Sequence, residues 1–427
     1  MSIFRVEGGI PLSGEVIPSG NKNEALPVLA ASLLARGPVT LRNVPRIGDT
    51  GTMAEAIRSL GAAVETPEPG TVAIDPSGIK DKDPDRGICA KIRASFLLAG
   101  PLLARRGHAT LPRPGGDRIG RRRLDTHLLA LQALGAEVSV GDEYRLTAPR
   151  GLTGTEIFLD EASVMATENA VMAAAAAAGT SVIYNAACEP HVQGVCRMLE
   201  SMGAGIDGIG SNVLTVKGNP EPGGCEHRVS PDHIEIGSFI GLAAVTGGEI
   251  AIRGIVPGHL RMIRMAFRRL GVETRLSGED LIVPGGQDPE VCCDIGGAIP
   301  SIADGPWPAF PADLTSIALV TATRSRGTVL IHEKMFESRL FFVDSLIAMG
   351  AKIVLCDPHR AVVNGPAELV GRTLSSPDIR AGMALLIAAL RADGISKIHN
   401  IQQIDRGYER IDERLRRLGA RIERMEE

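Results

Sequence analysis

Stretches that are apolar on nearly every side of a helix recur along the chain. One reads NEALPVLAASLLARG and leads into the strand-like PVTLRNVP, and another reads TENAVMAAAAAAG and leads into TSVIYNAA. The copies begin near Asn23, Arg93, Thr167, Ile234, Asp313 and Asp378. A helix that is apolar all round belongs inside a core rather than on its surface. The pattern therefore predicts six buried helices, each followed by a strand.

A second element has the same period. A helix-like stretch ends in a Leu/Met-Gly-Ala/Val turn, and a strand-like alternation follows, as in residues 136–140. Glycine suits this turn because the residue after a helix often adopts a left-handed conformation that costs other residues energy. The turn glycines are Gly61, Gly135, Gly203, Gly271, Gly350 and Gly419.

The period of roughly 65 to 80 residues is long enough for a complete β/α unit in each copy. Six units in 427 residues predict an α/β protein of two domains with three units each. A solenoid is the alternative, but its repeats are usually shorter.

Composition excludes several classes of protein. The formal net charge of −4 gives no attraction to nucleic acid or to an acidic membrane, and aromatic residues make up only 3% of the chain. The seven cysteines form no CxxC pair, which predicts reduced thiols in the cytoplasm and no structural zinc. The first residues lack the pattern of a secretory signal, and no apolar stretch is long enough to span a bilayer.

Charged residues gather where the buried helices are predicted to start. Capping alone accounts for Asn23, Asp313 and Asp378. It does not account for cations there, because a positive side chain opposes the dipole at a helix start. These cations are Lys22, Arg93 and Arg380. If the helix starts meet near a domain interface, the cations predict an anionic ligand among them.

Seven motifs resemble those of the UDP-N-acetylglucosamine 1-carboxyvinyltransferases, in the family's order and over nearly the whole chain. They are Ser19-Gly20-Asn21-Lys22-Asn23, Lys91-Ile92-Arg93-Ala94-Ser95, Pro114-Gly115-Gly116-Asp117-Arg118-Ile119-Gly120, Phe310-Pro311-Ala312-Asp313, Phe336-Glu337-Ser338-Arg339, Asp378-Ile379-Arg380-Ala381 and Ile404-Asp405-Arg406-Gly407-Tyr408-Glu409-Arg410. The resemblance implies two inside-out α/β domains, each of three β/α repeat units around buried helices. We expect one domain at residues 22–229 and the other at residues 1–21 plus 230–427.

The resemblance also implies an activity. The family transfers the enolpyruvyl group of phosphoenolpyruvate to the 3-hydroxyl of UDP-N-acetylglucosamine, the first committed step of peptidoglycan precursor synthesis. Lys22, Arg122 and Arg406 match residues that hold the phosphate and carboxylate of the donor, and arginine forks suit both groups. Other substrate-binding positions follow from the same motifs: Asn23, Arg93, Glu337, Arg339, Asp378 and Arg380.

Further roles come from single positions. Asp313 matches the base that takes the proton of the sugar hydroxyl. Asp125 and His127 match the segment beside the uracil, and Ser163 with Val164 matches the segment near the diphosphate. Neither a cofactor nor a metal ion is implied, so the expected partners are the two small-molecule substrates, with no nucleic acid and no membrane.

Asp117 lies where most members of the family carry a cysteine, in the glycine-rich, basic loop LPRPGGDRIGRRR. The resemblance makes it the general acid that protonates C3 of the donor. A carboxylic acid can do so only if enough of it stays protonated, which desolvation would favour and the nearby arginines would oppose. Fosfomycin alkylates the family's cysteine, so we expect this chain to be insensitive to the drug.

Three departures from the family concern the acceptor. Leu97 replaces an aromatic found in some members, Arg122-Arg123-Leu124 differs from the common Arg-Pro-Val, and the third is the segment 161–165. Glu161 stands where lysine is frequent and Met165 where glycine is usual, beside the expected diphosphate segment. Enolpyruvyl transfer to a different nucleotide or nucleotide sugar therefore remains an alternative, as does a non-catalytic paralogue that binds a nucleotide sugar. The presence of both an acid and a base argues against the paralogue.

Overall fold

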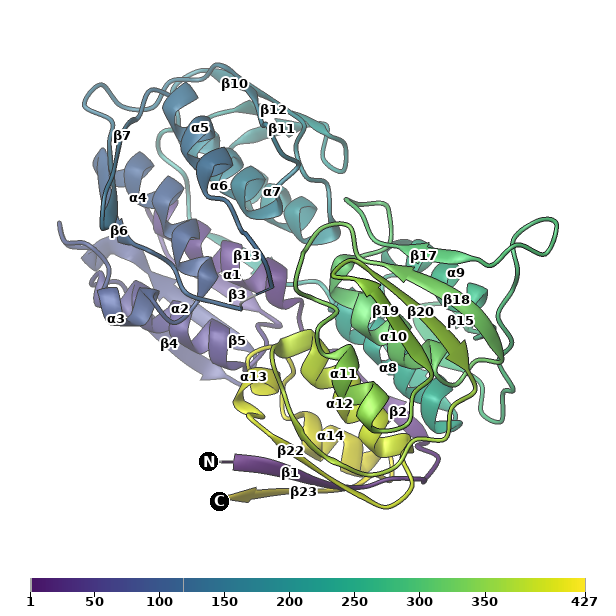
Figure 1. Cartoon of the computed structure of the whole chain (residues 1–427). Coiled ribbons are helices and arrows are strands. Elements are labelled where there is room, and N and C mark those ends of the chain that lie inside the picture. The colour runs from purple at the N-terminus through teal and green to yellow at the C-terminus, as the bar shows by residue number, and fades with distance from the viewer. Residues whose placement is uncertain (1, 118, 427) are drawn as a thin grey trace. The chain divides into compact units, whose positions relative to one another are not determined.

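A computed structural model describes residues 2–117 and 119–426. The chain divides into two compact units. The terminal unit comprises Met1–Ser19, Arg118–Arg121 and Pro231–Glu427, and the inserted unit comprises Gly20–Asp117 and Arg122–Ser230. Each unit is described by itself below, with the element labels of Figure 1.

In the inserted unit, three sheets lie around a group of buried helices. The sheets have the strand orders β13-β3-β5-β4, β6-β8-β7 and β11-β12-β10-β9. Their strands are β3 (Val39–Arg42), β4 (Ala63–Glu68), β5 (Thr71–Asp75), β6 (His108–Pro112), β7 (Glu137–Val140), β8 (Glu143–Thr147), β9 (Glu156–Phe158), β10 (Thr180–Tyr184), β11 (Gly205–Asp207), β12 (Val213–Lys217) and β13 (Cys225–Arg228).

The helices of the inserted unit form a central and an outer set. The central ones are α1 (Lys22–Ala31), α4 (Ala99–Arg106) and α6 (Val164–Ala175), with the 3₁₀ helix Arg93–Leu98 leading into α4. The others are α2 (Gly48–Ser59), α3 (Arg86–Cys89), α5 (Asp125–Ala133) and α7 (Pro190–Ser201). Central helix α6 is buried from Ala166 to its end because alanine and other apolar residues cover all its sides.

The terminal unit repeats this plan. Its sheets have the orders β21-β22-β1-β23, β15-β16-β14-β2 and β17-β18-β20-β19. Their strands are β1 (Ser2–Glu7), β2 (Gly14–Val16), β14 (Ile250–Ile252), β15 (Arg275–Ser277), β16 (Asp280–Val283), β17 (Ser301–Ala303), β18 (Gly327–His332), β19 (Ile353–Asp357), β20 (Arg360–Gly365), β21 (Thr373–Ser375), β22 (Ile395–His399) and β23 (Arg421–Glu426). The first strand, β1, pairs with the last, β23, so the two ends of the chain close one sheet (Figure 1).

Three helices form the centre of the terminal unit and contact one another. They are α8 (His233–Thr246), α10 (Thr315–Ala322) and α12 (Ile379–Arg391). Every residue of α8 is buried, which is the strongest form of the all-round apolar pattern. The remaining helices are α9 (Arg261–Arg269), α11 (Val343–Ala348), α13 (Gln402–Asp405) and α14 (Ile411–Arg417).

The six predicted repeats are confirmed. In each, a central helix leads into a strand, an outer helix and a glycine turn that opens a further strand. All six turn glycines have positive φ angles, between 79° and 110°, as the left-handed turn requires. The third central helix begins at Val164, earlier than the predicted Thr167. Thr167 lies inside the helix instead, where its hydroxyl donates to the Ser163 carbonyl at 2.8 Å.

The capping explanation of the helix starts holds at only one of three positions. The Asp378 carboxylate accepts from the backbone N–H groups of Arg380 and Ala381 and so caps α12. The first central helix is capped by Asn21 and not by Asn23. The carboxylate of Asp313 bonds to arginine side chains instead of a helix end.

Close approach of α4 to α6 depends on Gly100, and this gives the first prediction. A Cβ atom at Gly100 would lie 2.8 Å from the backbone oxygen of Asn169, so Gly100→Ala forces the helices apart. We expect a loss of about 1–3 kcal/mol in the free energy of unfolding, measured by urea denaturation. Gly51, on the exposed side of α2, has nothing within 4 Å of such a Cβ. Gly51→Ala should therefore stabilise by roughly 0.5–1 kcal/mol, and equal effects of the two substitutions would contradict the packing argument.

Candidate functional site

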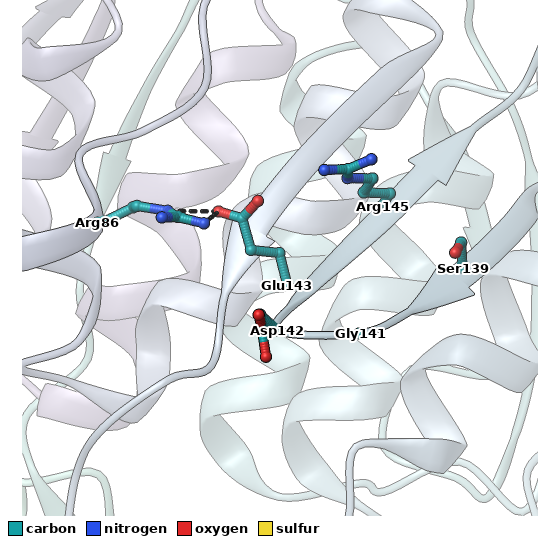
Figure 2. Close-up of a pocket in the computed structure, with 6 residues that line it drawn as sticks. All are labelled: Arg86, Ser139, Gly141, Asp142, Glu143 and Arg145. Carbon is teal, nitrogen blue, oxygen red and sulfur yellow. Dashed lines mark hydrogen bonds and ion pairs between the residues drawn. The ribbon is translucent and has the colours of Figure 1, made fainter.

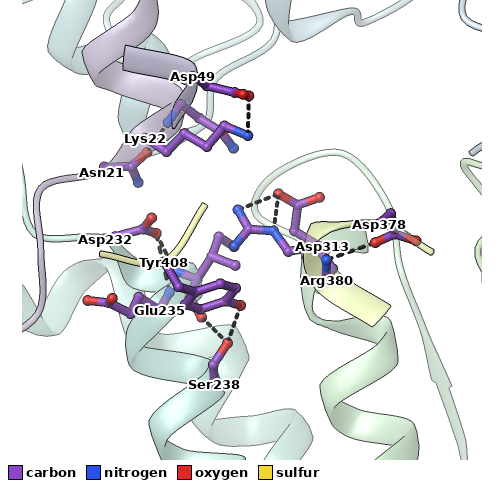
Figure 3. Close-up of polar contacts among 12 residues, drawn as sticks. Asn21, Lys22, Asp49, Asp232, Glu235, Ser238, Asp313, Asp378, Arg380 and Tyr408 are labelled. Carbon is purple, nitrogen blue, oxygen red and sulfur yellow. Dashed lines mark hydrogen bonds and ion pairs between the residues drawn. The ribbon is translucent and has the colours of Figure 1, made fainter. Parts of the chain in front are cut away.

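Lys22 is the first residue of α1, and it is buried with a carboxylate partner. Its Nζ lies 2.8 Å from an Oδ atom of Asp49, in the first turn of α2, and only 10% and 6% of the two side chains are exposed (Figure 3). Asn21 holds the start of the helix, since its side chain accepts from the N–H groups of Asn23 at 2.8 Å and Glu24 at 3.1 Å. The Lys22 ammonium group is thus fixed at the start of a helix. Its positive charge adds to the partial positive charge of the helix dipole there, so a nearby anion is stabilising.

Arg93 anchors the segment that carries Arg122. One Nη atom donates to the backbone oxygens of Arg122 at 2.7 Å and Arg123 at 3.0 Å. Burial, and then the charge of Arg122, lower the pKa of Arg93 to about 10. At neutral pH both guanidinium groups are therefore still charged, and the inserted unit holds two neighbouring cations here.

The segment after Arg122 is held by ion pairs at the start of α5. Arg123 contacts Asp125 at 3.3 Å and Asp160 at 2.8 Å, and the Thr126 hydroxyl donates to Asp160 at 2.7 Å. Asp125 itself is exposed at the first position of the helix.

His127 points into the interior of the inserted unit. It is 1% exposed, lies edge-on to Phe96, and its Nδ1 is 2.9 Å from the Asn169 side-chain amide. Burial first, and then the charges of Arg93 and Arg122, lower its pKa to about 3, so the ring is neutral at physiological pH. It supports the packing of α5 against α6; its expected place beside a uracil stays a prediction.

The expected diphosphate segment lies at the start of α6. Ser163 precedes the helix in extended conformation, and Val164 is its first residue. Glu161 is exposed, whereas Met165 packs against the hydrophobic core of the inserted unit. The Met165 side chain therefore contributes to the packing of the core.

In the terminal unit, one carboxylate is held by two buried arginines. An Oδ of Asp313 lies 2.5 Å from the Arg339 Nη2. The other Oδ accepts from Arg380 Nη2 at 3.0 Å and Nε at 3.2 Å (Figure 3). The arginine side chains are 8% and 5% exposed, and that of Asp313 is 23% exposed. One carboxylate thus accepts hydrogen bonds from both guanidinium groups.

The aromatic ring of Tyr408 supports Arg380. The guanidinium carbon of Arg380 lies 5.4 Å from the ring centroid, and the Tyr408 hydroxyl is 2.8 Å from that of Ser238 (Figure 3). Asp232, which caps α8, is buried nearby, and burial raises its pKa to about 6 although Arg380 acts against this. These contacts hold the guanidinium in a fixed orientation.

Residues 119–121, which follow Asp117 in the same loop, belong to the terminal unit. The backbone N–H of Arg121 donates to a carboxylate oxygen of Glu337 at 3.0 Å, and the backbone N–H of Ser338 donates to the Ile119 carbonyl at 3.2 Å. Backbone hydrogen bonds, first that of Glu337 itself and then that of Arg121, lower the pKa of the Glu337 carboxyl. Asp117 is half-buried, and Arg118 lies outside the described residues.

The candidate residues thus form two sets. The inserted unit holds Lys22, Asn23, Arg93, Asp117, Arg122, Asp125, His127, Ser163 and Val164, and the terminal unit holds Asp313, Glu337, Arg339, Asp378, Arg380 and Arg406. Arg406 donates to the Gln403 side chain at 2.7 Å. The structure brings together Arg93 with Arg122, and Asp313 with Arg339 and Arg380. Sequence reasoning missed Asp49, Asp232 and Tyr408, although Tyr408 lies within a quoted motif.

A hollow of about 270 Å³ on the inserted unit contains none of these residues. Asp142 lines it together with Arg86 and Glu143, which form an ion pair (Figure 2). Among residues 2–117 and 119–426, no group of three or more His, Cys, Asp and Glu side chains could hold a metal ion. Over the same residues, no helix combines the length and the apolar character that crossing a membrane requires.

Known proteins match nearly the whole chain. The profile of the EPSP synthase (3-phosphoshikimate 1-carboxyvinyltransferase) family matches residues 6–415. A UDP-N-acetylglucosamine 1-carboxyvinyltransferase of Bradyrhizobium diazoefficiens is 57% identical over 99% of this chain and 98% of its own. An enzyme of the same name from Treponema denticola is 54% identical over 100% of both chains.

Solved structures agree on the fold. The enolpyruvyl transferase NikO from Streptomyces tendae aligns over 99% of both chains with a TM-score of 0.87 and 23% identity. An EPSP synthase from Acinetobacter baumannii aligns over 100% of both chains with a TM-score of 0.75 and 19% identity. The predicted fold class, with three β/α units around buried helices in each of two inside-out α/β domains, is confirmed.

The Lys22–Asp49 pair gives the second prediction. Removing either partner leaves a buried charge without its counterion, so Lys22→Met and Asp49→Asn should each cost about 3 kcal/mol of unfolding free energy. The double variant should lose less than the sum, as measured in a urea-denaturation cycle. The exposed pair Arg36–Glu221 of the same unit is the control and should show a coupling below about 1 kcal/mol. Additive losses at Lys22 and Asp49 would rule out the coupling.

Proposed function

The chain belongs to the UDP-N-acetylglucosamine 1-carboxyvinyltransferases within the EPSP synthase family, and from this we propose its reaction. It transfers the enolpyruvyl group of phosphoenolpyruvate to the 3-hydroxyl of UDP-N-acetylglucosamine and releases phosphate. The observation that carries the proposal is the 57% identity over nearly the full length of both chains. The reaction would serve peptidoglycan synthesis in the cytoplasm, and through it cell wall biogenesis, cell shape and cell division.

Unsatisfied guanidinium donors support the binding of an anion in the terminal unit. Arg339 Nε and Arg380 Nη1 are buried and have no hydrogen-bond partner among the described residues. Buried N–H groups nearly always have partners, so these two suit oxygen atoms of a substrate. Carboxylate and phosphate groups are the natural ligands of such donors.

Cations of both units are assigned to the donor substrate. In this proposal Lys22 and Arg122 of the inserted unit act with Arg406 of the terminal unit on the phosphate and carboxylate. The hydrogen bond from the Arg93 guanidinium to the Arg122 carbonyl, 2.7 Å long, supports this assignment, because it fixes the segment that carries the Arg122 side chain.

Asp313 is the proposed base. Two guanidinium groups keep the carboxylate ionised, as a base must be, but they also occupy its oxygens. A substrate anion that takes over part of the bonding to Arg339 and Arg380 would free an oxygen of Asp313. The carboxylate could then accept the proton of the 3-hydroxyl.

The proposed steps balance as follows. Asp313 takes the hydroxyl proton, the sugar oxygen forms a bond to C2 of phosphoenolpyruvate, and Asp117 gives a proton to C3. The Asp117 carboxylate then takes back a proton from C3 of the tetrahedral intermediate, and phosphate leaves C2 with the proton that Asp313 held, which restores the double bond as an enol ether. The arginines stabilise the negative charge in both steps.

The third prediction tests the reaction itself. Phosphate release from phosphoenolpyruvate should require UDP-N-acetylglucosamine, and UMP should not replace the sugar nucleotide. Asp117→Ala should lower kcat by about a hundredfold or more, because it removes the general acid. Asp142→Ala, an exposed aspartate of the same unit, should retain activity. Release with UMP alone would move the proposal to another acceptor, and no release at all would favour a binding protein.

The fourth prediction concerns fosfomycin. The drug alkylates a cysteine thiolate, and a carboxylate is a far poorer nucleophile, so the wild-type chain should lose no activity over time. The variant Asp117→Cys should become sensitive, with loss of activity that grows with incubation time. Rapid inactivation of the wild type at low drug concentration would contradict the assignment of Asp117 to this position.

A further inference from the structure

Arg406 lies on a short turn of the terminal unit whose inner side packs against the core. The turn begins with α13, a single helical turn that ends at Asp405, and a helix of this length is not stable alone. Ile404 is 0% exposed, and a Cβ atom on Gly407 would lie 2.3 Å from the Ile379 side chain at the start of α12. Core packing therefore holds the residues on either side of Asp405 and Arg406, whereas these two are only half-buried.

Arg424 holds the outer side of the same turn. Its two Nη atoms donate to the two carboxylate oxygens of Asp405, each at 2.8 Å. A bidentate pair of this kind is stronger and more directional than a single contact. The end of α13 is thus tied to β23, the last strand of the chain.

The Arg424 guanidinium is itself fixed in place by two further elements. Its carbon lies 4.9 Å from the ring centroid of Phe4, the residue directly across from it on β1. One Nη also donates to Asp412 in the first turn of α14 at 3.1 Å. Arg416 donates to the other oxygen of Asp412 at 3.0 Å, which holds that carboxylate in turn. The guanidinium is therefore a rigid anchor for α13.

The turn carries two groups of the candidate site, which are held in different ways. Arg406 donates to Gln403 of α13 at 2.7 Å, so its guanidinium follows the position of that helix. Tyr408, which supports Arg380, is 1% exposed, and its hydroxyl is 2.8 Å from that of Ser238. The core therefore holds Tyr408 directly, whereas Arg406 depends on α13.

We propose that Arg424 is a positioning residue for the donor substrate: by its bidentate pair with Asp405 it fixes α13 and, with it, the guanidinium of Arg406. The inference rests on the proposed function, in which Arg406 binds phosphoenolpyruvate. Arg424 touches no substrate in this role. Its pairing also keeps the Asp405 carboxylate from turning to the neighbouring Arg406, where it would compete with the anionic donor.

The fifth prediction is a selective loss of donor binding. Arg424→Gln should raise the KM for phosphoenolpyruvate by about fivefold to tenfold, because Arg406 is no longer held and Asp405 is left charged beside it. The KM for UDP-N-acetylglucosamine and kcat should each stay within about twofold of wild type, because Tyr408 still supports Arg380. Steady-state kinetics, with each substrate varied at a saturating concentration of the other, measure all three constants.

The matched control is Arg421→Gln, since Arg421 lies on the same strand and forms an exposed ion pair with Glu7. It should leave all three constants within about twofold of wild type. Arg424→Lys keeps the charge but cannot form the bidentate pair, so its KM for phosphoenolpyruvate should lie between those of wild type and Arg424→Gln. Equal increases in KM for both substrates, or the same change in Arg421→Gln, would overturn the positioning role.

A double variant tests whether the effect passes through Asp405. Asp405→Asn breaks the same pair from the other side and should raise the KM for phosphoenolpyruvate by about threefold or more, and it tests the pair even if Arg424→Gln does not fold. Because the two side chains act as one unit, adding Asp405→Asn to Arg424→Gln should raise this KM no further. An increase that multiplies the two single effects would contradict the proposal.

Hydrogen exchange separates this inference from the proposed function, because it needs no turnover. The amides of residues 402–408 should exchange faster in Arg424→Gln than in wild type or Arg421→Gln, because α13 opens more often without its outer anchor. Unchanged exchange would refute the anchoring by Arg424. Absence of turnover in the wild type would refute the proposed function and leave the exchange result standing. Normal turnover of Arg424→Gln with an unchanged KM for phosphoenolpyruvate would refute the positioning role alone.

Discussion

Six helices that are apolar on all sides impose the constraint on which the rest of this structure depends. Because their sides are packed, polar chemistry has a place mainly at their ends. Lys22 opens α1, Arg93 opens the 3₁₀ helix that leads into α4, and Arg380 is the second residue of α12. Asp313 lies just ahead of α10. Burial of these helices thus determines both the fold and the positions at which charged side chains can lie.

Charge compensation follows from that placement. A buried cation at a helix start is opposed by the dipole and by desolvation, so the fold supplies carboxylates close by. Asp49 forms an ion pair with Lys22, and Asp313 forms ion pairs with both Arg339 and Arg380. Asp378, which caps α12, and Asp232, which caps α8, add further carboxylates beside these two arginines.

The repeats could be predicted from the sequence because the spacing of apolar residues indicates which faces of a helix or strand are buried. The six turn glycines followed from the same pattern, since only one backbone conformation fits the turn. The partners of the charged residues could not be predicted: Asp49 lies on the next helix from Lys22, and no spacing rule joins them. Asn21 and Asn23 are equally good caps by composition, and only the backbone geometry selects Asn21. The roles of the site residues came from the resemblance alone.

The arrangement around Asp313 couples substrate binding to the proposed base. The two guanidinium groups that hold this carboxylate also carry the unsatisfied donors, Arg339 Nε and Arg380 Nη1. An anion that bonds to these donors shares the same two charges, so its binding must weaken the hold on Asp313, and a tighter hold must weaken the anion's binding in return. A base that is released only when the donor arrives stays bonded to arginine, and so out of action, in the absence of the donor.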